Sequence, residues 1–140
     1  MFKDLKSNAC YDNADLYKLI RYSMKNLKDE DIDEYLKKVR TQNEYDVVGY
    51  YENEKLMGLL IYKVENELVV IEVISVEKDE RGKGIGETIL EEAQKRTQCE
   101  KIEAVCELLA TNFYKKMGFE IESLEKNYYN EVFYKCTKRF

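Results

Sequence analysis

Apolar residues recur at helical spacing in the first third of the chain. Leucine, isoleucine and methionine lie three or four positions apart within residues 12–26, which predicts an amphipathic helix with Asp12 or Asn13 as its N-terminal cap. The same kind of spacing predicts a second helix over residues 29–41. Both helices are expected to cover a core with their apolar faces.

The pattern then changes to runs that are rich in β-branched and aromatic residues. These runs predict three strands, at Tyr45–Tyr51, Leu56–Val64 and Leu68–Val76. Short polar breaks at residues 52–54 and 65–67 separate the strands, so we expect an antiparallel meander.

The rest of the chain predicts further helices and strands. In order, we expect a glycine-rich turn at 82–86, a helix to about Arg96, a strand at Lys101–Cys106, a helix at Leu108–Met117 that Gly118 ends, and strands at Phe119–Leu124 and Tyr128–Cys136. The strand, helix and strand between residues 68 and 106 imply two neighbouring parallel strands. The sequence therefore predicts an α/β fold with a mixed sheet flanked by helices.

No boundary between domains is visible in the sequence. The 140 residues contain no proline, no low-complexity linker and no evident repeat. Because a chain of this length can support one core without staples, we expect a single domain over residues 1–140.

Charge and cysteine content narrow the classes of function. Lysine and arginine total 23 and aspartate and glutamate total 28, so the net charge of −5 argues against nucleic acid as the main partner and tolerates a cationic amine. The four cysteines form no CxxC pair and histidine is absent, so no zinc site of the Cys/His kind is expected. The start of the chain lacks the apolar run of a signal peptide, and every apolar run is too short to span a membrane. Widely spaced, reduced thiols favour a cytoplasmic protein.

The turn between the third strand and the next helix has the composition of a phosphate cradle. Its residues are Arg81, Gly82, Lys83, Gly84, Ile85 and Gly86. Glycines let bare backbone approach a ligand, the helix start aims free N–H groups at it, and the two basic side chains add positive charge. The alternative is an ordinary strand-to-helix turn. The turn does not match the dinucleotide-binding motif GxGxxG, because Glu87 stands where the third glycine should be. It does not match the P-loop motif GxxxxGK[ST] either, because Gly84 follows Lys83 in place of a serine or threonine.

Two blocks of the sequence resemble the GNAT superfamily of N-acetyltransferases. The spacing Arg81-x-x-Gly84-x-Gly86 resembles that superfamily's pyrophosphate-binding signature, and the preceding run 74–76 fits it as well. The later run 110–119, which contains Tyr114, resembles a second block of the same superfamily. The predicted order of elements agrees with this resemblance from about residue 12 to the C-terminus.

The resemblance implies a sheet that splays between strands four and five, with acetyl-CoA in the gap. The backbone of Ile74, Ser75 and Val76 would pair with the pantetheine arm, and the Ile74 amide would polarise the thioester carbonyl. The amides of Gly82 to Gly86 would hold the pyrophosphate. Asn112 is a further candidate contact to the cofactor, with a solvated helix position as the alternative.

The sequence also departs from the superfamily's pattern. Glu107 stands where an asparagine is common, and the N-terminal segment lacks the usual first strand rich in arginine and threonine. No motif defines the acceptor side of the site, which we expect the helices over 12–26 and 29–41 and the last two strands to shape.

Direct transfer of an acetyl group to an amine needs a proton acceptor and a proton donor. Tyr114 matches the position of the tyrosine that similar enzymes place near the CoA sulfur, so it is the candidate acid, with packing against the sheet as the alternative. Glu72 is the candidate base, because a carboxylate within an apolar strand is costly unless it is paired or functional. Polyamine acetyltransferases similarly carry a glutamate nine residues before the motif arginine. By strand alternation Glu72 should share a face with Ile74 and Val76, and a structural ion pair is its alternative role.

The sequence thus predicts an acetyl-CoA-dependent N-acetyltransferase that acts on a primary amine of a small molecule or a protein. A non-catalytic acyl-CoA-binding sensor is the alternative, and a toxin that acetylates aminoacyl-tRNA is a third reading that the acidic composition disfavours. An acyl-cysteine route through Cys106 is disfavoured, because it would normally use a histidine partner. No metal and no membrane are expected to take part, and a homodimer is a further hypothesis.

Overall fold

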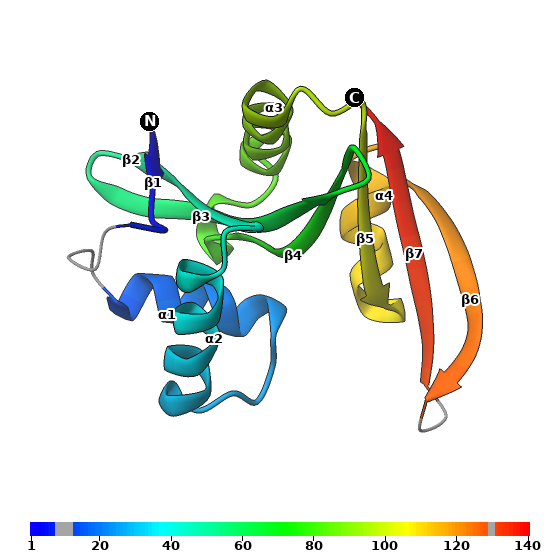
Figure 1. The fold of residues 1–140 in the computed structure, drawn as a ribbon, viewed down its shortest axis with the longest axis horizontal. Coiled ribbons are helices and arrows are strands. Elements are labelled where there is room, and N and C mark those ends of the chain that lie inside the picture. Colours follow the sequence, from blue (N-terminus) through cyan, green and yellow to red (C-terminus); the bar gives the residue numbers. More distant parts are fainter. Residues whose placement is uncertain (8–12, 129–130) are drawn as a thin grey trace.

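One seven-stranded sheet organises the residues that the computed structural model describes, which are 1–7, 13–128 and 131–140. The strands are β1 (Phe2–Asp4), β2 (Tyr45–Glu52), β3 (Lys55–Glu65), β4 (Leu68–Val76), β5 (Lys101–Glu107), β6 (Glu120–Tyr128) and β7 (Glu131–Arg139). They stand in the order β1-β2-β3-β4-β5-β7-β6 (Figure 1). Within the described chain, β4 and β5 pair in parallel and the other neighbours pair antiparallel, as the sequence predicts.

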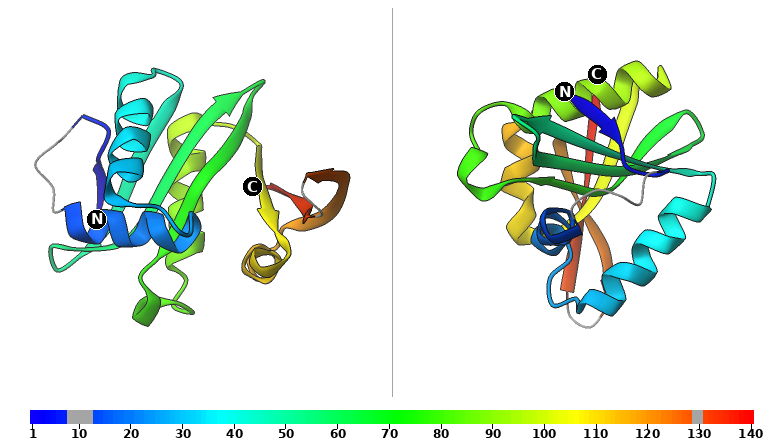
Figure 2. Two further views of the ribbon diagram at one scale, coloured as in Figure 1. Left: turned by 90° about the horizontal axis from the view of Figure 1, so that it is seen from below. Right: turned by 90° about the vertical axis from the view of Figure 1, so that its left-hand side faces the viewer.

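Helices flank the sheet on both faces. They are α1 (Asn13–Ser23), α2 (Asp29–Thr41), α3 (Ile85–Thr97) and α4 (Thr111–Lys116), with short 3-10 turns η1 (Lys78–Glu80) and η2 (Leu108–Ala110). The first two cover one face of the β1–β4 part, α3 covers the opposite face, and α4 packs beside β5 and β7 (Figures 1 and 2). Two buried apolar clusters follow from this arrangement, one under α1 and α2 and the other shared by α3 and α4.

Most of the predicted elements are confirmed, with shifts at their ends. The predicted helix over 12–26 is α1, which ends at Ser23, and the candidate cap Asp12 lies outside the described residues. The helix expected at Leu108–Met117 is a 3-10 turn followed by the shorter α4. Gly118 ends α4 as predicted, with a φ of 86°.

The expectation that the N-terminal segment lacks a first strand is wrong. The short segment β1 pairs antiparallel with β2, and Phe2 lies opposite Tyr50. Its three residues include neither arginine nor threonine, as expected, and they are too few to show an alternating pattern. The strand exists because the edge of β2 supplies its hydrogen bonds.

The sheet splays between β4 and β5, as the sequence resemblance implies. The two strands pair only where Leu68–Val70 meets residues 101–103. Beyond Val70, β4 continues for six residues on a course that diverges from β5 (Figure 1). This divergence leaves one edge of a buried strand without a strand partner in the described chain.

Candidate active site

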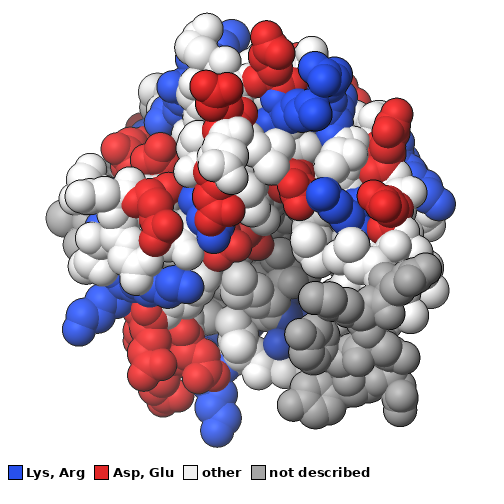
Figure 3. Space-filling model, turned by 45° about the vertical axis from the view of Figure 1, so that its right-hand side comes forward, with Lys and Arg blue, Asp and Glu red and all other residues white. Residues whose placement is uncertain are grey.

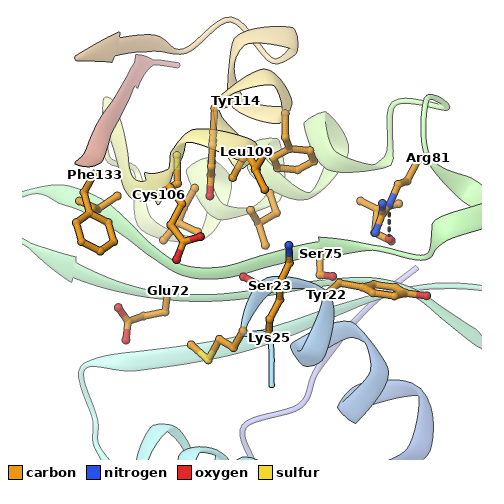
Figure 4. Close-up of a pocket in the computed structure, with 18 of the residues that line it drawn as sticks. Tyr22, Ser23, Lys25, Glu72, Ser75, Arg81, Cys106, Leu109, Tyr114 and Phe133 are labelled. Atoms are coloured by element: carbon orange, nitrogen blue, oxygen red, sulfur yellow. Dashed lines mark hydrogen bonds between the residues drawn. The ribbon is translucent and has the colours of Figure 1, made fainter. Parts of the chain in front are cut away.

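The divergence of β4 and β5 opens a cleft with a volume of about 760 Å³. Its walls come from the end of α1 with the loop that follows it, from β4, from the β5–α4 segment and from β7 (Figure 4). Six of the candidate catalytic and cofactor-binding residues line this cleft: Glu72, Ile74, Ser75, Val76, Arg81 and Tyr114. The fold therefore brings the candidate acid, the candidate base and the proposed cofactor-binding strand into one cavity.

The free edge of β4 forms one wall. Ile74, Ser75 and Val76 are buried, and each is paired with β3 on the other side. Backbone groups on the edge that faces β5 are therefore available to an extended ligand, which can add to the sheet as a further strand. The Ser75 hydroxyl is buried and has no hydrogen-bond partner among the described residues.

The glycine turn stands at the end of this strand with open space above it. Gly82 and Gly84 have φ angles of 81° and 83°, and a Cβ at either position would meet nothing within 4 Å. Gly84 precedes the first turn of α3, whose N–H groups at Ile85 and Gly86 have no intrahelical acceptor. Gly86 has a packing role in addition, because a Cβ there would lie 3.1 Å from the Met117 sulfur.

Two basic side chains flank the turn. The Arg81 Nε donates a hydrogen bond to the Val76 carbonyl at 3.2 Å, and its guanidinium carbon lies 4.9 Å from the centre of the Tyr22 ring. The exposed Lys83 ammonium pairs with Glu80 at 2.8 Å. Positive charge, free N–H groups and open space thus coincide, and these are the elements of an anion site.

Tyr114 points its hydroxyl into the cleft, toward Cys106 (Figure 4). Its ring packs edge-on against Phe113 and Phe119, with centroid distances of 5.3 and 5.2 Å. A turn at Gly118 fixes this position, because the Phe119 N–H donates back to the Tyr114 carbonyl at 3.1 Å. Burial raises the pKa of the Tyr114 hydroxyl above its ordinary value of 10.0, so the phenol stays protonated at neutral pH.

Glu72 lies at a β-bulge, which corrects its predicted orientation. The residues on either side of it, Ile71 and Val73, pair with successive residues of β3, so Glu72 is the extra residue of the bulge. Ile74 and Val76 pack in the cluster with α3. The Glu72 charge instead acts on Tyr35 of α2, whose pKa is raised mainly by burial and then by Glu72. The prediction that Glu72 shares a face with Ile74 and Val76 is therefore wrong.

The half-buried Glu72 still lines the cleft, on the α1 and α2 side (Figure 4). Among the described residues it has no hydrogen bond and no ion pair, so the structural ion pair considered from the sequence has no support there. Its carboxylate is open to the cavity.

Cys106 and Cys136 form a pair of thiols beside Tyr114, with their sulfur atoms 3.5 Å apart. Burial raises the pKa of both thiols, that of Cys136 to about 12. Because the thiolate is the reactive form, this environment argues against Cys106 as a nucleophile.

An ion-pair network that sequence reasoning missed ties α1 to the end of β4. The nearly buried Glu77 pairs with Lys18 of α1 at 2.7 Å and accepts a hydrogen bond from the Tyr22 hydroxyl at 3.4 Å. The hydrogen bond from Lys18 is the main cause that lowers the pKa of Glu77. These partners lie about sixty residues apart in sequence, and no local pattern connects them.

The wall of the cleft away from the glycine turn includes residues 22–26, Val105, Leu109 and Phe133. The expected helix over 12–26 and the last strand contribute to it, whereas no described lining residue comes from α2. Asn112, by contrast, is exposed on α4 and is not one of the described residues that line the cleft.

The described residues contain no group of three or more His, Cys, Asp or Glu side chains placed to hold a metal ion. None of the helices in the described ranges is long and apolar enough to cross a membrane.

Comparisons with solved structures agree with the fold. The chain is similar to an aminoglycoside 6'-N-acetyltransferase in complex with coenzyme A, with a TM-score of 0.79, 14% identity and coverage of 99% of this chain and 96% of that one. It is also similar to a putative GNAT-family acetyltransferase from Desulfovibrio desulfuricans, with a TM-score of 0.76, 16% identity and coverage of 99% of this chain and 98% of that one. A third similar structure is the ribosomal-protein-S18-alanine N-acetyltransferase from Escherichia coli, with a TM-score of 0.71, 16% identity and coverage of 99% of this chain and 94% of that one. At these identities the likeness establishes the fold alone.

A comparison with family models extends the result to the sequence. No curated protein matches the chain in sequence. The model of the acetyltransferase (GNAT) domain matches residues 43–121, which is more than half of the chain and includes β4, the glycine turn and Tyr114. The chain therefore belongs to the GNAT acetyltransferase family.

Proposed function

We propose that this protein is an N-acetyltransferase that moves the acetyl group of acetyl-CoA to a primary amine by direct transfer. The observation that supports this proposal most strongly is the free β4 edge, which leads to the glycine turn at one end and faces the protonated Tyr114 hydroxyl across the cleft. A thin, extended ligand with an anionic group at one end fits this arrangement.

The residues on the two walls fit acetyl-CoA. The backbone of Ile74 and Val76 would hold the pantetheine arm, and the N–H groups at residues 82–86 with Arg81 and Lys83 would hold the pyrophosphate. The open space above Gly82 and Gly84 allows this approach, because no described atom lies within 4 Å of where a Cβ would stand at either position. When bound, acetyl-CoA supplies an activated acyl group on a thiol leaving group.

The chain's own residues would then manage two protons. Glu72 would accept a proton from the incoming ammonium through a water molecule, since its carboxylate is open to the cleft. Tyr114 would donate a hydrogen bond and then a proton to the departing sulfur, and the Ile74 amide would stabilise negative charge on the acyl oxygen. The acid and the base stand on different walls, so one group does not have to perform both tasks.

A non-catalytic acyl-CoA sensor is the main alternative. A sensor needs the cofactor-binding wall, but it needs neither a proton donor over the leaving group nor an open acceptor side. The third hypothesis was a toxin that acetylates aminoacyl-tRNA. On the face that Figure 3 shows, the basic side chains of the described residues form no continuous patch. A substrate with a long phosphate backbone therefore has no evident footprint there.

The direct test is amine-dependent release of free thiol from acetyl-CoA. We expect a panel of primary amines, peptide N-termini included, to contain acceptors that increase the rate of thiol release over the rate without amine. A melting curve of the same protein with acetyl-CoA is the necessary control. A clear rise in melting temperature without turnover on any amine would favour the sensor, and no rise at all would overturn both functions.

A further inference from the structure

The acceptor side of the cleft has an apolar wall. Cross-strand partners share a face of a sheet, and Glu107 of β5 lies opposite Phe133 of β7. Val105, two residues earlier on the same face, is 56% exposed, while its neighbour Ala104 on the other face is buried. All three side chains, Val105, Glu107 and Phe133, line the cleft. A solvent-facing wall of this composition is suited to contact with a ligand.

A second, smaller hollow of about 200 Å³ continues this wall. It is lined by Glu107, Leu108, Leu109 and Val132, and it shares Glu107 and Leu109 with the main cleft. Its apolar members are strongly exposed, at 62% for Leu108, 82% for Leu109 and 43% for Val132.

Exposed apolar side chains are therefore concentrated at this one place. Of the six large apolar side chains that are exposed in the described chain, the four named above gather here, and the other two are Met1 and Val64. Such a concentration beside a cleft marks a binding surface rather than chance exposure.

The charges around the wall favour a cation. Glu72 and Glu107 both line the cleft, and neither has an ion pair among the described residues. Glu103, two residues before Val105 on β5, does have one, with Lys135 at 3.8 Å. Lys25 contributes one positive charge from the loop after α1, and Arg81 lies at the cofactor end (Figure 4). Carboxylates thus outnumber basic groups on the acceptor side.

We infer that the acceptor is a monoamine with an apolar alkyl or aryl body and no anionic group. This inference rests on the proposed function. The ammonium would sit between Glu72 and Glu107, and the apolar body would cover Val105 and Leu109 and extend into the second hollow. In the reaction the amine nitrogen forms a bond to the acetyl carbon as the carbon–sulfur bond breaks. The ammonium first loses one proton through water to Glu72, and the departing sulfur takes a proton from Tyr114. The second nitrogen proton, which is released as the amide forms, passes through water to restore the Tyr114 phenol. A polyhydroxylated amine would instead lose its own hydration on an apolar wall that offers little in return.

Three probes of matched length test this inference. They are hexylamine, its polar isostere 2-(2-aminoethoxy)ethanol, and 6-aminohexanoate, each assayed by thiol release at saturating acetyl-CoA. We expect kcat/KM for hexylamine to exceed that for the polar isostere by roughly tenfold or more, because a buried methylene and the terminal methyl are replaced by ether and hydroxyl oxygens. The anionic probe should be the poorest of the three, because Glu72 and Glu107 repel its carboxylate.

Variants test whether the preference for hexylamine arises at the apolar wall that includes Val105. Val105→Thr keeps a β-branched side chain of nearly the same volume in the strand, so it should fold, and it should reduce the preference for hexylamine by roughly fivefold. Val64→Thr is the matched control, because Val64 is an exposed valine on β3 that does not line the cleft, and it should leave the preference unchanged. Glu107→Gln should narrow the gap between hexylamine and 6-aminohexanoate.

The outcomes separate this inference from the proposed function. If amines are acetylated but the polar isostere equals or exceeds hexylamine, the inference is overturned and the N-acetyltransferase proposal stands. If Val105→Thr and Val64→Thr change the preference equally, the apolar body does not bind this wall. If no amine is acetylated while acetyl-CoA still raises the melting temperature, the proposed function itself is wrong.

Discussion

The two parts of the sheet on either side of the cleft are covered differently. The N-terminal part, β1–β4, has α1 and α2 on one face and α3 on the other, so both of its faces are buried. The C-terminal part, made of β5, β7 and β6, has α4 on one face, while side chains such as Val105 on the other face remain exposed. The enclosed part is built to hold its shape, and the half-covered part is where a variable ligand can bind.

This difference suggests a division of tasks. The N-terminal part carries the free β4 edge and the glycine turn, which would bind the cofactor. The C-terminal part carries the Tyr114 hydroxyl and the exposed acceptor wall. Variants on the two sides should therefore separate binding of acetyl-CoA from turnover.

Tyr114→Phe should give the largest effect. Loss of a general acid typically lowers kcat by roughly 10²–10⁴-fold, whereas the ring that packs against Phe113 and Phe119 is kept, so acetyl-CoA affinity should change little. Steady-state kinetics and a binding isotherm on the same sample measure both quantities. Tyr50→Phe is the control, because the Tyr50 hydroxyl donates an exposed hydrogen bond to Glu52 and Tyr50 does not line the cleft. If affinity falls as steeply as kcat, the division of tasks fails.

Glu72→Gln should lower kcat by about 10²-fold near neutral pH, the lower end of the range for a general base. The loss should shrink as pH rises, since more of the amine is then already deprotonated and needs no base. Stability should be nearly unchanged, because the described structure shows no ion pair for Glu72. Glu103→Gln, which removes the partner of Lys135, is the control on the neighbouring strand. A pH–rate profile identical to that of the parent protein would remove Glu72 from the mechanism.

Gly84→Ala should weaken cofactor binding without blocking folding. The new methyl group would project into the open space above the turn, where the pyrophosphate is proposed to lie. At about 100 times its dissociation constant, acetyl-CoA should stabilise the parent protein by about 2.7 kcal/mol, and most of this gain should be lost in the variant. Gly118→Ala is a matched control, because its φ of 86° gives similar backbone strain at a helix end outside the cradle. Equal melting-temperature gains with acetyl-CoA in both variants would place the cradle elsewhere.

Lys18→Met should give the smallest effect, and one that depends on pH. The folded-state pKa of Glu77 lies below its ordinary value of 4.5, so the stabilisation from its ionised form is present above that value and is lost as pH falls through the lower folded value. The variant should therefore melt below the parent protein at neutral pH, and the two curves should converge in acid. Lys115→Met, on the exposed face of α4, should show no such convergence. A difference that persists in acid would mean that Lys18 acts through packing.

The sequence predicted the long elements of the fold well, for a physical reason. Helices that bury one face carry a strong period in their own residues, and β2, β3 and β4 are marked by runs of β-branched and aromatic residues between short polar breaks. The short strand β1 was missed because three residues show no period. The bulge at Glu72 was missed because residues 68–76 are apolar on both faces, so nothing in the pattern marks where alternation slips.

The candidate site was predictable where local chemistry defines it. The turn from Arg81 to Gly86 and the block around Tyr114 are short motifs, and the fold places Arg81 and Tyr114 on one cleft. The Lys18–Glu77 pair and the apolar wall at Val105 arise only when distant segments meet. Such contacts depend on the three-dimensional arrangement, and one sequence contains no direct signal for them.

The splayed sheet has a further consequence for solubility. A long, apolar strand with an unpaired edge, such as β4 beyond Val70, would normally be a template for aggregation with the sheet of another molecule. Here that edge lies inside a wedge, and β5 and β7 form the opposing side. A second sheet needs a whole strand with flanking neighbours to dock, and the wedge admits only a slender chain without them. The protein thereby keeps a strand edge open to a slender ligand and denies the same edge to the sheet of another molecule.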